Sequence, residues 1–194
     1  MPKVFFTSDL HHSHRNILKF TDRNLVTTPE DHTQWLIDLW NSQVSPGDLV
    51  YVLGDVSFSK SYDKLATFIG QLNGNIQVIL GNHDNSQHIK RLLSDKLITW
   101  CGPYKEVDIN GTKTCLFHYP IAAWNRQHHG SYHLFGHCHS SYNHAAKGKC
   151  LDVGLDSIYS LFGSYFFPDT DFITEYMSHR ELFTPDHHNP KEPR

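Results

Sequence analysis

Five short apolar runs along the chain each end abruptly in residues that can bind a metal ion or a phosphate group. The runs cover residues 4–8, 49–53, 76–80, 115–117 and 133–135. Apolar runs of this length predict strands that are buried on both faces. Their polar endings are Asp9-Leu10-His11, Gly54-Asp55, Gly81-Asn82-His83-Asp84, His118 and Gly136-His137-Cys138-His139. Because ligands of an open α/β sheet bind outside the carboxyl ends of its strands, we expect the five endings to meet in one crevice.

Segments with helical periodicity separate the first three runs. Residues 16–20 predict a short helix, and Pro29 opens a longer one with four large apolar residues at helical spacing. Residues 62–69 and 89–93 predict two further helices. An alternation of strand and helix is typical of a parallel sheet with right-handed crossovers.

The second half of the chain is predicted to be rich in strands. Residues 104–109 and 113–117 flank Asn110-Gly111, a dipeptide that favours the type I′ turn of a β-hairpin. Residues 149–153 predict another strand. Together the two halves predict an α/β (α+β) fold.

No linker, internal repeat or low-complexity tract divides the chain. A length of 194 residues suffices for one well-buried core, so we expect a single domain over residues 1–183. Residues 184–194 are polar and rich in proline and histidine, which predicts a disordered tail.

The composition narrows the class of protein. Hydrophobic residues make up 39% of the chain and charged residues 19%, which is ordinary for a soluble globular protein. A net charge of -3 provides no basic field for nucleic acid, and no apolar stretch approaches the roughly 20 residues that span a bilayer. The four cysteines lack C-x-x-C spacing, and no signal peptide is recognisable, so we expect a cytoplasmic protein of a bacterium or of a phage-infected host. No membrane contact and no obligate protein partner are predicted.

The strand endings supply seven candidate metal ligands, more than one tetrahedral ion needs. They are Asp9, His11, Asp55, Asn82, His118, His137 and His139. Two divalent ions that share a bridging ligand fit this number better, and such a pair suits phosphoryl chemistry. Nitrogen and oxygen donors without thiolate fit Mn²⁺, Fe or Ni²⁺ and also allow Zn²⁺. His83 lies between a ligand and Asp84, which we expect to hold the ring of His83 while it protonates a leaving oxygen.

The five blocks, in this order, resemble the pattern of the calcineurin-like metallophosphoesterases: D-x-H, G-D, G-N-H-D or G-N-H-E, H, and G-H-x-H. The resemblance covers about residues 3–155. It implies a four-layer sandwich of two mixed β-sheets flanked by helices, and two divalent metal ions, with Mn²⁺ first among the candidates. By the same resemblance, Asp9, His11 and His139 hold the first ion, Asn82, His118 and His137 hold the second, and Asp55 bridges them. His83 would be the proton donor or phosphate-binding histidine, with Asp84 as its orienting partner.

A closer likeness is to small single-domain bacterial and bacteriophage members with S-D-x-H-x-x-H-x-N-I after the first strand and H-Y-P after the hairpin. Residues 8–17 and 118–120 carry these motifs. That subgroup often has an aromatic residue and a glycine where this chain has His12 and Ser13. The resemblance therefore does not predict the shape of the loop beside the metal ligands. His14, Arg15 and Asn16, and more weakly Arg23, are candidates to bind a substrate phosphate, although a role in capping and surface solvation explains them as well.

Other features allow a simpler interpretation. A cysteine nucleophile at Cys138 would need a Cys-x5-Arg loop, but position 144 is His, so Cys138 is predicted to be a small packing residue. Four further histidines line either a solvated loop or a wall of the substrate site: His128, His129, His133 and His144.

The expected function is hydrolysis of phosphate esters by in-line attack of a metal-bridging hydroxide. A short chain leaves little material for a cap, so the cleft is expected to be open, which favours a phosphodiesterase acting on a nucleotide or a nucleic-acid end. The alternative is a phosphomonoesterase that acts on nucleotides or phosphoproteins. A non-catalytic protein-binding scaffold is a third alternative, but such proteins tend to lose ligands that are all present here.

Overall fold

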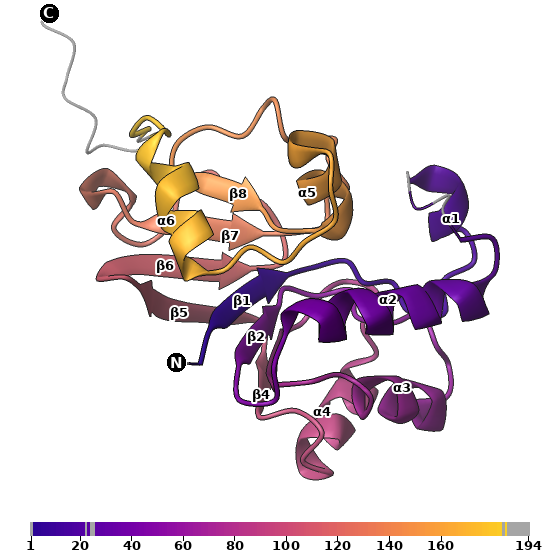
Figure 1. Cartoon of the computed structure of the whole chain (residues 1–194). Coiled ribbons are helices and arrows are strands. Elements are labelled where there is room, and N and C mark those ends of the chain that lie inside the picture. Colours follow the sequence, from indigo (N-terminus) through magenta and orange to yellow (C-terminus); the bar gives the residue numbers. More distant parts are fainter. Residues whose placement is uncertain (1, 22, 24–25, 184, 186–194) are drawn as a thin grey trace, which may run out of the picture.

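The first of two β-sheets is formed by the first half of the chain. The structure, a computed structural model, describes residues 2–21, 23, 26–183 and 185. Four strands pair in the order β1-β2-β3-β4, and every pair is parallel. They are β1 (Val4–Thr7), β2 (Leu49–Val52), β3 (Asn75–Ile79) and β4 (Trp100–Gly102). A helix-containing segment joins each strand to the next, as parallel pairing requires (Figure 1).

Four helices belong to these crossovers: α1 (Ile17–Phe20), α2 (Pro29–Gln43), α3 (Tyr62–Ile69) and α4 (Ser86–Ser94). All four confirm helices predicted from the sequence. The side chain of Thr28 caps α2 by accepting a hydrogen bond from the backbone N–H of Asp31, and Pro29 occupies the first turn. Helix α2 begins at the residue where the sequence predicts it to begin.

The second sheet is formed by the second half of the chain. Its strands pair in the order β5-β6-β7-β8, the first pair antiparallel and the other two parallel. They are β5 (Tyr104–Ile109), β6 (Thr112–Phe117), β7 (Tyr132–Phe135) and β8 (Cys150–Asp152). Asn110 and Gly111 both have positive φ, 48° and 85°, as a type I′ turn demands, so the predicted hairpin is confirmed.

One expectation needs correction, and three elements were missed. Only the second sheet is mixed, because each helical crossover of the first half returns the chain to the end of the sheet at which the previous strand began, so that every strand of the first sheet is parallel. Strand β4 and the helices α5 (Leu155–Phe162) and α6 (Thr170–Ser178) were not predicted. Strand β4 has only three residues, too few for an alternating pattern to emerge.

Two hydrophobic clusters lie on opposite faces of the first sheet. Alternate strand residues point to opposite faces, so Val50 and Val52 pack with α2, α3 and α4, whereas Phe6 and Tyr51 pack against the second sheet. Helices α5 and α6 contribute Ile158 and Ile173 to this second cluster. The single domain over residues 1–183 stays a prediction, and the predicted tail lies, apart from Pro185, outside the described residues.

The carboxyl ends of the two sheets meet where β1 runs beside the chain that follows β8. Ser8 forms a parallel bridge with Gly154, and the backbone N–H of Asp9 donates to the carbonyl of Gly54. The backbone N–H of Gly136 donates in turn to the carbonyl of His118. These bonds bring the predicted strand endings to one place. In the described part of the chain, no helix combines the length and the apolar character that crossing a membrane requires.

Candidate metal centre

Five of the predicted ligands have left-handed backbone. Their φ angles lie between 44° and 72°, a region that residues other than glycine rarely adopt; they are Asp9, His11, Asp55, His137 and His139. Each such residue costs about 1–3 kcal/mol, and strain of this kind tends to gather at functional sites. Hydrogen bonds between the loops hold three of them: the backbone N–H of Asp9 donates to the carbonyl of Gly54, that of His11 to the carbonyl of Asp55, and that of His137 to Oδ2 of Asp9.

A first group of ligand atoms comes from Asp9, His11 and His139, whose atoms all lie within 4.8 Å of one another. The Nε2 atoms of His11 and His139 are 3.1 Å apart, and they lie 3.5 Å and 3.6 Å from Oδ1 of Asp9. Two donor atoms about 2.1 Å from one cation, at angles of about 90–109°, are about 3.0–3.4 Å apart. The distance of 3.1 Å between the two histidine nitrogens lies in this range, and the distances of 3.5 Å and 3.6 Å to Asp9 lie just above it, so the first group is close to the spacing of ligands to a shared cation.

A second group comes from Asp55, His118 and His137, again within 4.8 Å. Nε2 of His118 lies 3.6 Å from Oδ1 of Asp55 and 2.9 Å from Oδ1 of Asn82. The other oxygen of Asp55 lies 3.7 Å from Nε2 of His11, so this carboxylate faces both groups. All seven predicted ligands are brought to the two groups.

A buried oxygen tests whether cations fit here. Oδ1 of Asp9 is buried and has no hydrogen-bond partner among the described residues, while its other oxygen accepts from the backbone N–H of His137 at 2.9 Å. Burial alone would raise the pKa of Asp9, but the His11 and His139 rings hold it below its usual range. A buried carboxylate oxygen without a partner is costly unless a positive charge satisfies it. The residues present therefore fit a cation in the first group.

Two motif glycines are required for close approach. A Cβ at Gly54 would lie 2.5 Å from Nδ1 of His118, and one at Gly136 would lie 2.5 Å from Oδ2 of Asp9. Gly54 also has a φ of 95°. Any side chain at either position would displace a predicted ligand.

His83 stands at the rim of the centre. Its side chain is exposed, and its ring packs beside Phe58, with 4.5 Å between centroids. The His11 ring is 6.0 Å away. The backbone N–H of His83 donates to Oδ1 of Asp55 at 2.9 Å, which ties its position to the second group.

The carboxylate of Asp84 has different partners from those expected from the sequence. Its carboxylate accepts hydrogen bonds from the backbone N–H groups of Asp55, Val56 and Gly81, at 2.8–3.0 Å. Burial raises its pKa to about 6, although these donors pull in the other direction. The expected pairing with the His83 ring is not found, because both oxygens are engaged by backbone. Asp84 instead joins the two loops that carry Asp55 and Asn82.

The predicted substrate-binding residues differ in their surroundings. The His14 ring stacks on Phe58 with centroids 3.7 Å apart and lies 5.2 Å from the His11 ring. Burial lowers its pKa to about 4. Arg15 and Asn16 are exposed beside α1. Contact of these three residues with a substrate stays a prediction.

Arg23 is not available to a substrate phosphate. Its side chain is fully buried and donates to the carbonyls of Asp9 and Leu10 and to both oxygens of Asp156. The weaker prediction that Arg23 grips a phosphate is therefore wrong, because all of its donor directions point into protein. The sequence analysis missed Asp156 altogether.

Three other features are clarified by the packing. His12 is buried, stacks on Phe68 at 4.2 Å and lies 2.9 Å from the Ser57 hydroxyl, so the ring fills space beneath the loop. His133 is also buried, against the carbonyls of Cys115 and Tyr119, which removes it from the suggested substrate wall. Burial raises the pKa of Cys138 to about 11, in keeping with a packing role.

Phe58 is a further residue that the sequence analysis missed. It contacts the rings of His11, His14 and His83 and so forms one wall of the centre. The signal that could have found it is its place three residues after Asp55, in the loop that follows a strand ending. An isolated phenylalanine near a predicted strand is far more often a core residue, so this signal alone is weak.

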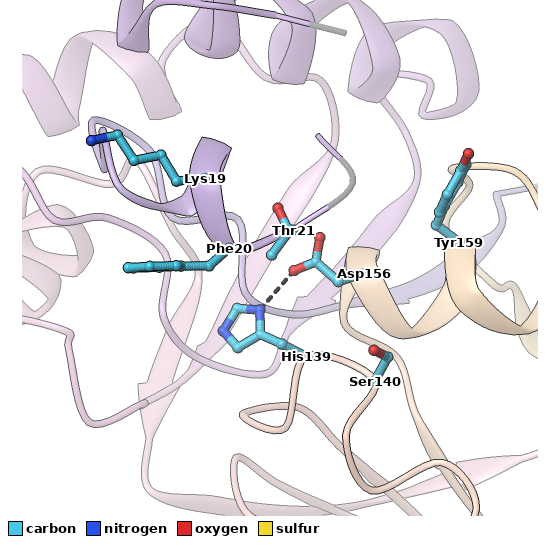
Figure 2. A pocket seen from close by; sticks show the side chains of 7 residues that line it. All are labelled: Lys19, Phe20, Thr21, His139, Ser140, Asp156 and Tyr159. Carbon is cyan, nitrogen blue, oxygen red and sulfur yellow. Dashed lines mark hydrogen bonds and ion pairs between the residues drawn. The ribbon is translucent and has the colours of Figure 1, made fainter. Parts of the chain in front are cut away.

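A cavity of about 220 Å³ adjoins the first group at His139. Figure 2 shows His139 and Asp156 facing each other, with residues of α1 on one side and Tyr159 of α5 on the other. The remaining lining residues are Lys19, Phe20, Thr21 and Ser140. Phe20 is 76% exposed, the highest value among the large hydrophobic residues described as exposed.

No protein-family model matches the chain. Two proteins resemble it over most of their length. The uncharacterized protein MJ1445 of Methanocaldococcus jannaschii is 32% identical over 166 residues, covering 81% of this chain and 84% of that protein. The gene 66 protein of Mycobacterium phage D29 is 30% identical over 186 residues, covering 83% of this chain and 92% of that protein.

One solved structure shows a shared fold. The protein of unknown function AQ665 from Aquifex aeolicus superposes with a TM-score of 0.67 at 17% identity, over 91% of this chain and 100% of that chain. A novel archaeal phosphodiesterase gives a TM-score of 0.43 at 19% identity, over 70% of this chain and 72% of that chain, which is too low to establish a common fold.

Proposed function

The chain belongs to the same family as MJ1445 and the phage D29 gene 66 protein, and we propose that it is a dinuclear metal-dependent phosphoesterase that favours diesters. We also propose that it is a calcineurin-like metallophosphoesterase of the small single-domain form and has that family's four-layer fold. One observation carries it: two groups of histidine and aspartate ligand atoms lie side by side, and the Asp55 carboxylate faces both.

Each group would hold one cation. Asp9, His11 and His139 would bind the first, Asn82, His118 and His137 the second, and Asp55 would contribute an oxygen to each. Two divalent cations at such a centre activate a water molecule and neutralise the charge of phosphate oxygens. The donor set favours Mn²⁺, with Fe, Ni²⁺ and Zn²⁺ as alternatives.

The protein's own residues would supply the proton and the geometry. His83 is exposed at the rim while its backbone is fixed to Asp55, so its ring can reach a leaving oxygen from the solvent side. Phe58 limits the positions of the His83 and His14 rings. His14 would then contact a phosphate oxygen beside the first group.

The cavity beside His139 supports the choice of a diester. A phosphodiester carries two organic groups, and this cavity offers room for one of them next to a ligand of the first group (Figure 2). The exposed ring of Phe20 provides a flat apolar surface on which a nucleobase can stack. We therefore extend the proposal to a nucleotide or a nucleic-acid end as the substrate. Free cysteines at all four positions support a reducing, cytoplasmic setting.

The test is hydrolysis of bis-p-nitrophenyl phosphate and p-nitrophenyl phosphate after chelation and re-addition of Mn²⁺. We expect Mn²⁺-dependent activity with the higher kcat/KM on the diester. Preference for the monoester would replace the diesterase with a phosphomonoesterase. Binding of two Mn²⁺ ions without turnover of either compound would favour a non-catalytic scaffold. The variant Phe20→Ala is expected to raise KM for a dinucleotide substrate several-fold, about 1 kcal/mol, while leaving bis-p-nitrophenyl phosphate unaffected.

A further inference from the structure

A chain of buried polar contacts runs behind the first group. Nδ1 of His139 lies 2.6 Å from Oδ2 of Asp156, on the side of the ring opposite to the nitrogen that faces Asp9 (Figure 2). With a proton on Nδ1, this bond leaves the lone pair of Nε2 directed toward the candidate cation position. Carboxylates behind ligating histidines act in this way in many metal sites.

Arg23 fixes the carboxylate of Asp156 in turn. Nε of Arg23 donates to one oxygen of Asp156 at 2.8 Å, and Nη2 donates to the other at 2.9 Å. The guanidinium is planar, so this two-point contact also sets the plane of the carboxylate. The side chains are 0% and 6% exposed, which limits competition from water for this contact.

The same guanidinium holds the backbone that carries Asp9. Nη2 donates to the carbonyl of Asp9 at 2.6 Å, and Nη1 donates to that of Leu10 at 2.9 Å. Asp9 has a φ of 57°, and these bonds offset the cost of its left-handed conformation. One arginine therefore positions two ligands of the first group that lie 130 positions apart in the sequence.

In the described part of the chain, no pair of buried side chains comparable to Arg23 and Asp156 stands behind the second group. His137 is exposed, and its ring contacts are with His118 and Tyr119. Asn82 is exposed too. His118 is fixed from behind by backbone, since its Nδ1 lies 2.7 Å from the carbonyl of Leu53. Ligands that are already held in place lose less conformational freedom when a cation binds.

We propose that Asp156 and Arg23 are positioning residues that orient His139 and the Asp9 turn, and thereby make the first group the tighter of the two cation sites. This inference rests on the proposed function, because it needs two cation sites to compare. It assigns no contact with substrate to either residue.

The first test uses the unaltered protein. Crystals of metal-free protein equilibrated with one equivalent of Mn²⁺ are expected to show an anomalous peak between Asp9, His11 and His139. A peak in the second group, or equal peaks in both, would overturn the ranking and leave a two-ion enzyme intact. Absence of any peak even with excess Mn²⁺ would instead refute the proposed function together with this inference.

The second test measures both dissociation constants by titration calorimetry. Asp156→Asn is expected to weaken the tighter site about 10- to 100-fold and to leave the weaker one within about threefold. Arg23→Lys, which keeps the charge but loses the fork, should weaken the same site by a smaller factor. Asp48→Asn is the matched control, because Asp48 is 6% exposed, like Asp156 at 7%, and accepts hydrogen bonds from the backbone N–H groups of Lys3 and Ser45. An equal loss at both sites in Asp156→Asn, or the same loss in Asp48→Asn, would mean that a general loosening of the fold is responsible and would overturn the positioning role.

Discussion

The two ligand groups use similar side chains, but different parts of the molecule hold them. Behind the first group stand the buried side chains of Arg23 and Asp156, which come from distant segments. The second group is held through contacts with the backbone. The carboxylate of Asp84 accepts hydrogen bonds from three backbone N–H groups of its loops, and Nδ1 of His118 contacts the carbonyl of Leu53. His137 and Asn82 are exposed, whereas Asp9 and His11 are buried.

This contrast indicates that the two groups have different roles at the centre. In the first group, the buried side chains of Arg23 and Asp156 hold Asp9 and His139 in one arrangement. In the second group, the exposed ligands Asn82 and His137 leave room for a water molecule or a substrate oxygen, as catalytic metal sites require. The following predictions test this difference.

The largest effect is expected from the residue that the two groups share. Asp55→Asn removes the charge that faces both groups, so we expect kcat/KM to fall about 10³-fold or more and both cations to bind more weakly. Diester hydrolysis and calorimetric Mn²⁺ titration are the measurements. Asp38→Asn, at an exposed position on α2, serves as the control. Near-normal turnover with two bound ions would refute the bridging role of Asp55.

The next effect concerns the rim of the second group. His83→Ala should leave both dissociation constants for Mn²⁺ unchanged and lower kcat about 100-fold, the scale of a lost acid/base group. The loss should grow as the pKa of the leaving group rises, and a series of substituted phenyl diesters measures this. His179→Ala, on an exposed face, should change nothing. A loss that is the same for every leaving group would exclude proton donation by His83.

A substitution at Asp84 tests whether this residue supports the loops of the second group or orients the His83 ring. Asp84→Asn replaces an acceptor of three backbone N–H groups by an amide with one oxygen, and we expect a loss of about 1–3 kcal/mol in the free energy of unfolding of the metal-free protein. Urea unfolding measures it, with His83→Ala as the variant expected to keep normal stability. An Asp84→Asn protein of normal stability that reproduces the leaving-group pattern of His83→Ala would restore the ring-orienting role.

The smallest expected effect is a pH dependence of the free energy of unfolding, which arises from His32 beside Arg23. Burial and the neighbouring Arg23 lower the pKa of His32 from 6.5 to about 3. The unfolded chain therefore takes up this proton at a higher pH than the folded protein does. The resulting stability is present above about pH 6.5 and is lost as the pH falls toward 3.

Between pH 7 and pH 5.5, His32 should account for a loss of about 1 kcal/mol in the free energy of unfolding. Urea unfolding of metal-free wild type and His32→Gln at both pH values gives the difference. The slope should be shallower in the variant by this amount. Identical slopes would show that His32 does not titrate in this way, and that Arg23 lies in a less buried environment than the structure indicates.

Local patterns in the sequence predicted much of this architecture. Helical spacing of apolar residues predicted α2 and α3, because that spacing records which face of a helix is buried. The dipeptide Asn110-Gly111 predicted the β5–β6 hairpin. The polar endings of buried runs predicted where the seven ligands gather. Strand β4 was missed because a three-residue strand has no visible period, and α5 was missed because it begins after Gly154 without a side-chain cap. Helix α6 does have a start signal, since the side chain of Asp169 accepts a hydrogen bond from the backbone N–H of Phe172, and the sequence analysis overlooked it.

By itself, the sequence determined which residue types stand at the ends of the strands, since chain connectivity and strand burial place them at one edge of each sheet. Only the tertiary structure decided which of them have partners. Asp156 contacts His139 and Arg23, which lie up to 133 positions away in the sequence. The carboxylate of Asp84 binds backbone N–H groups instead of the His83 ring. The physical reason is that a hydrogen bond depends on positions in space set by the packing of two sheets, and no local pattern of residues records them.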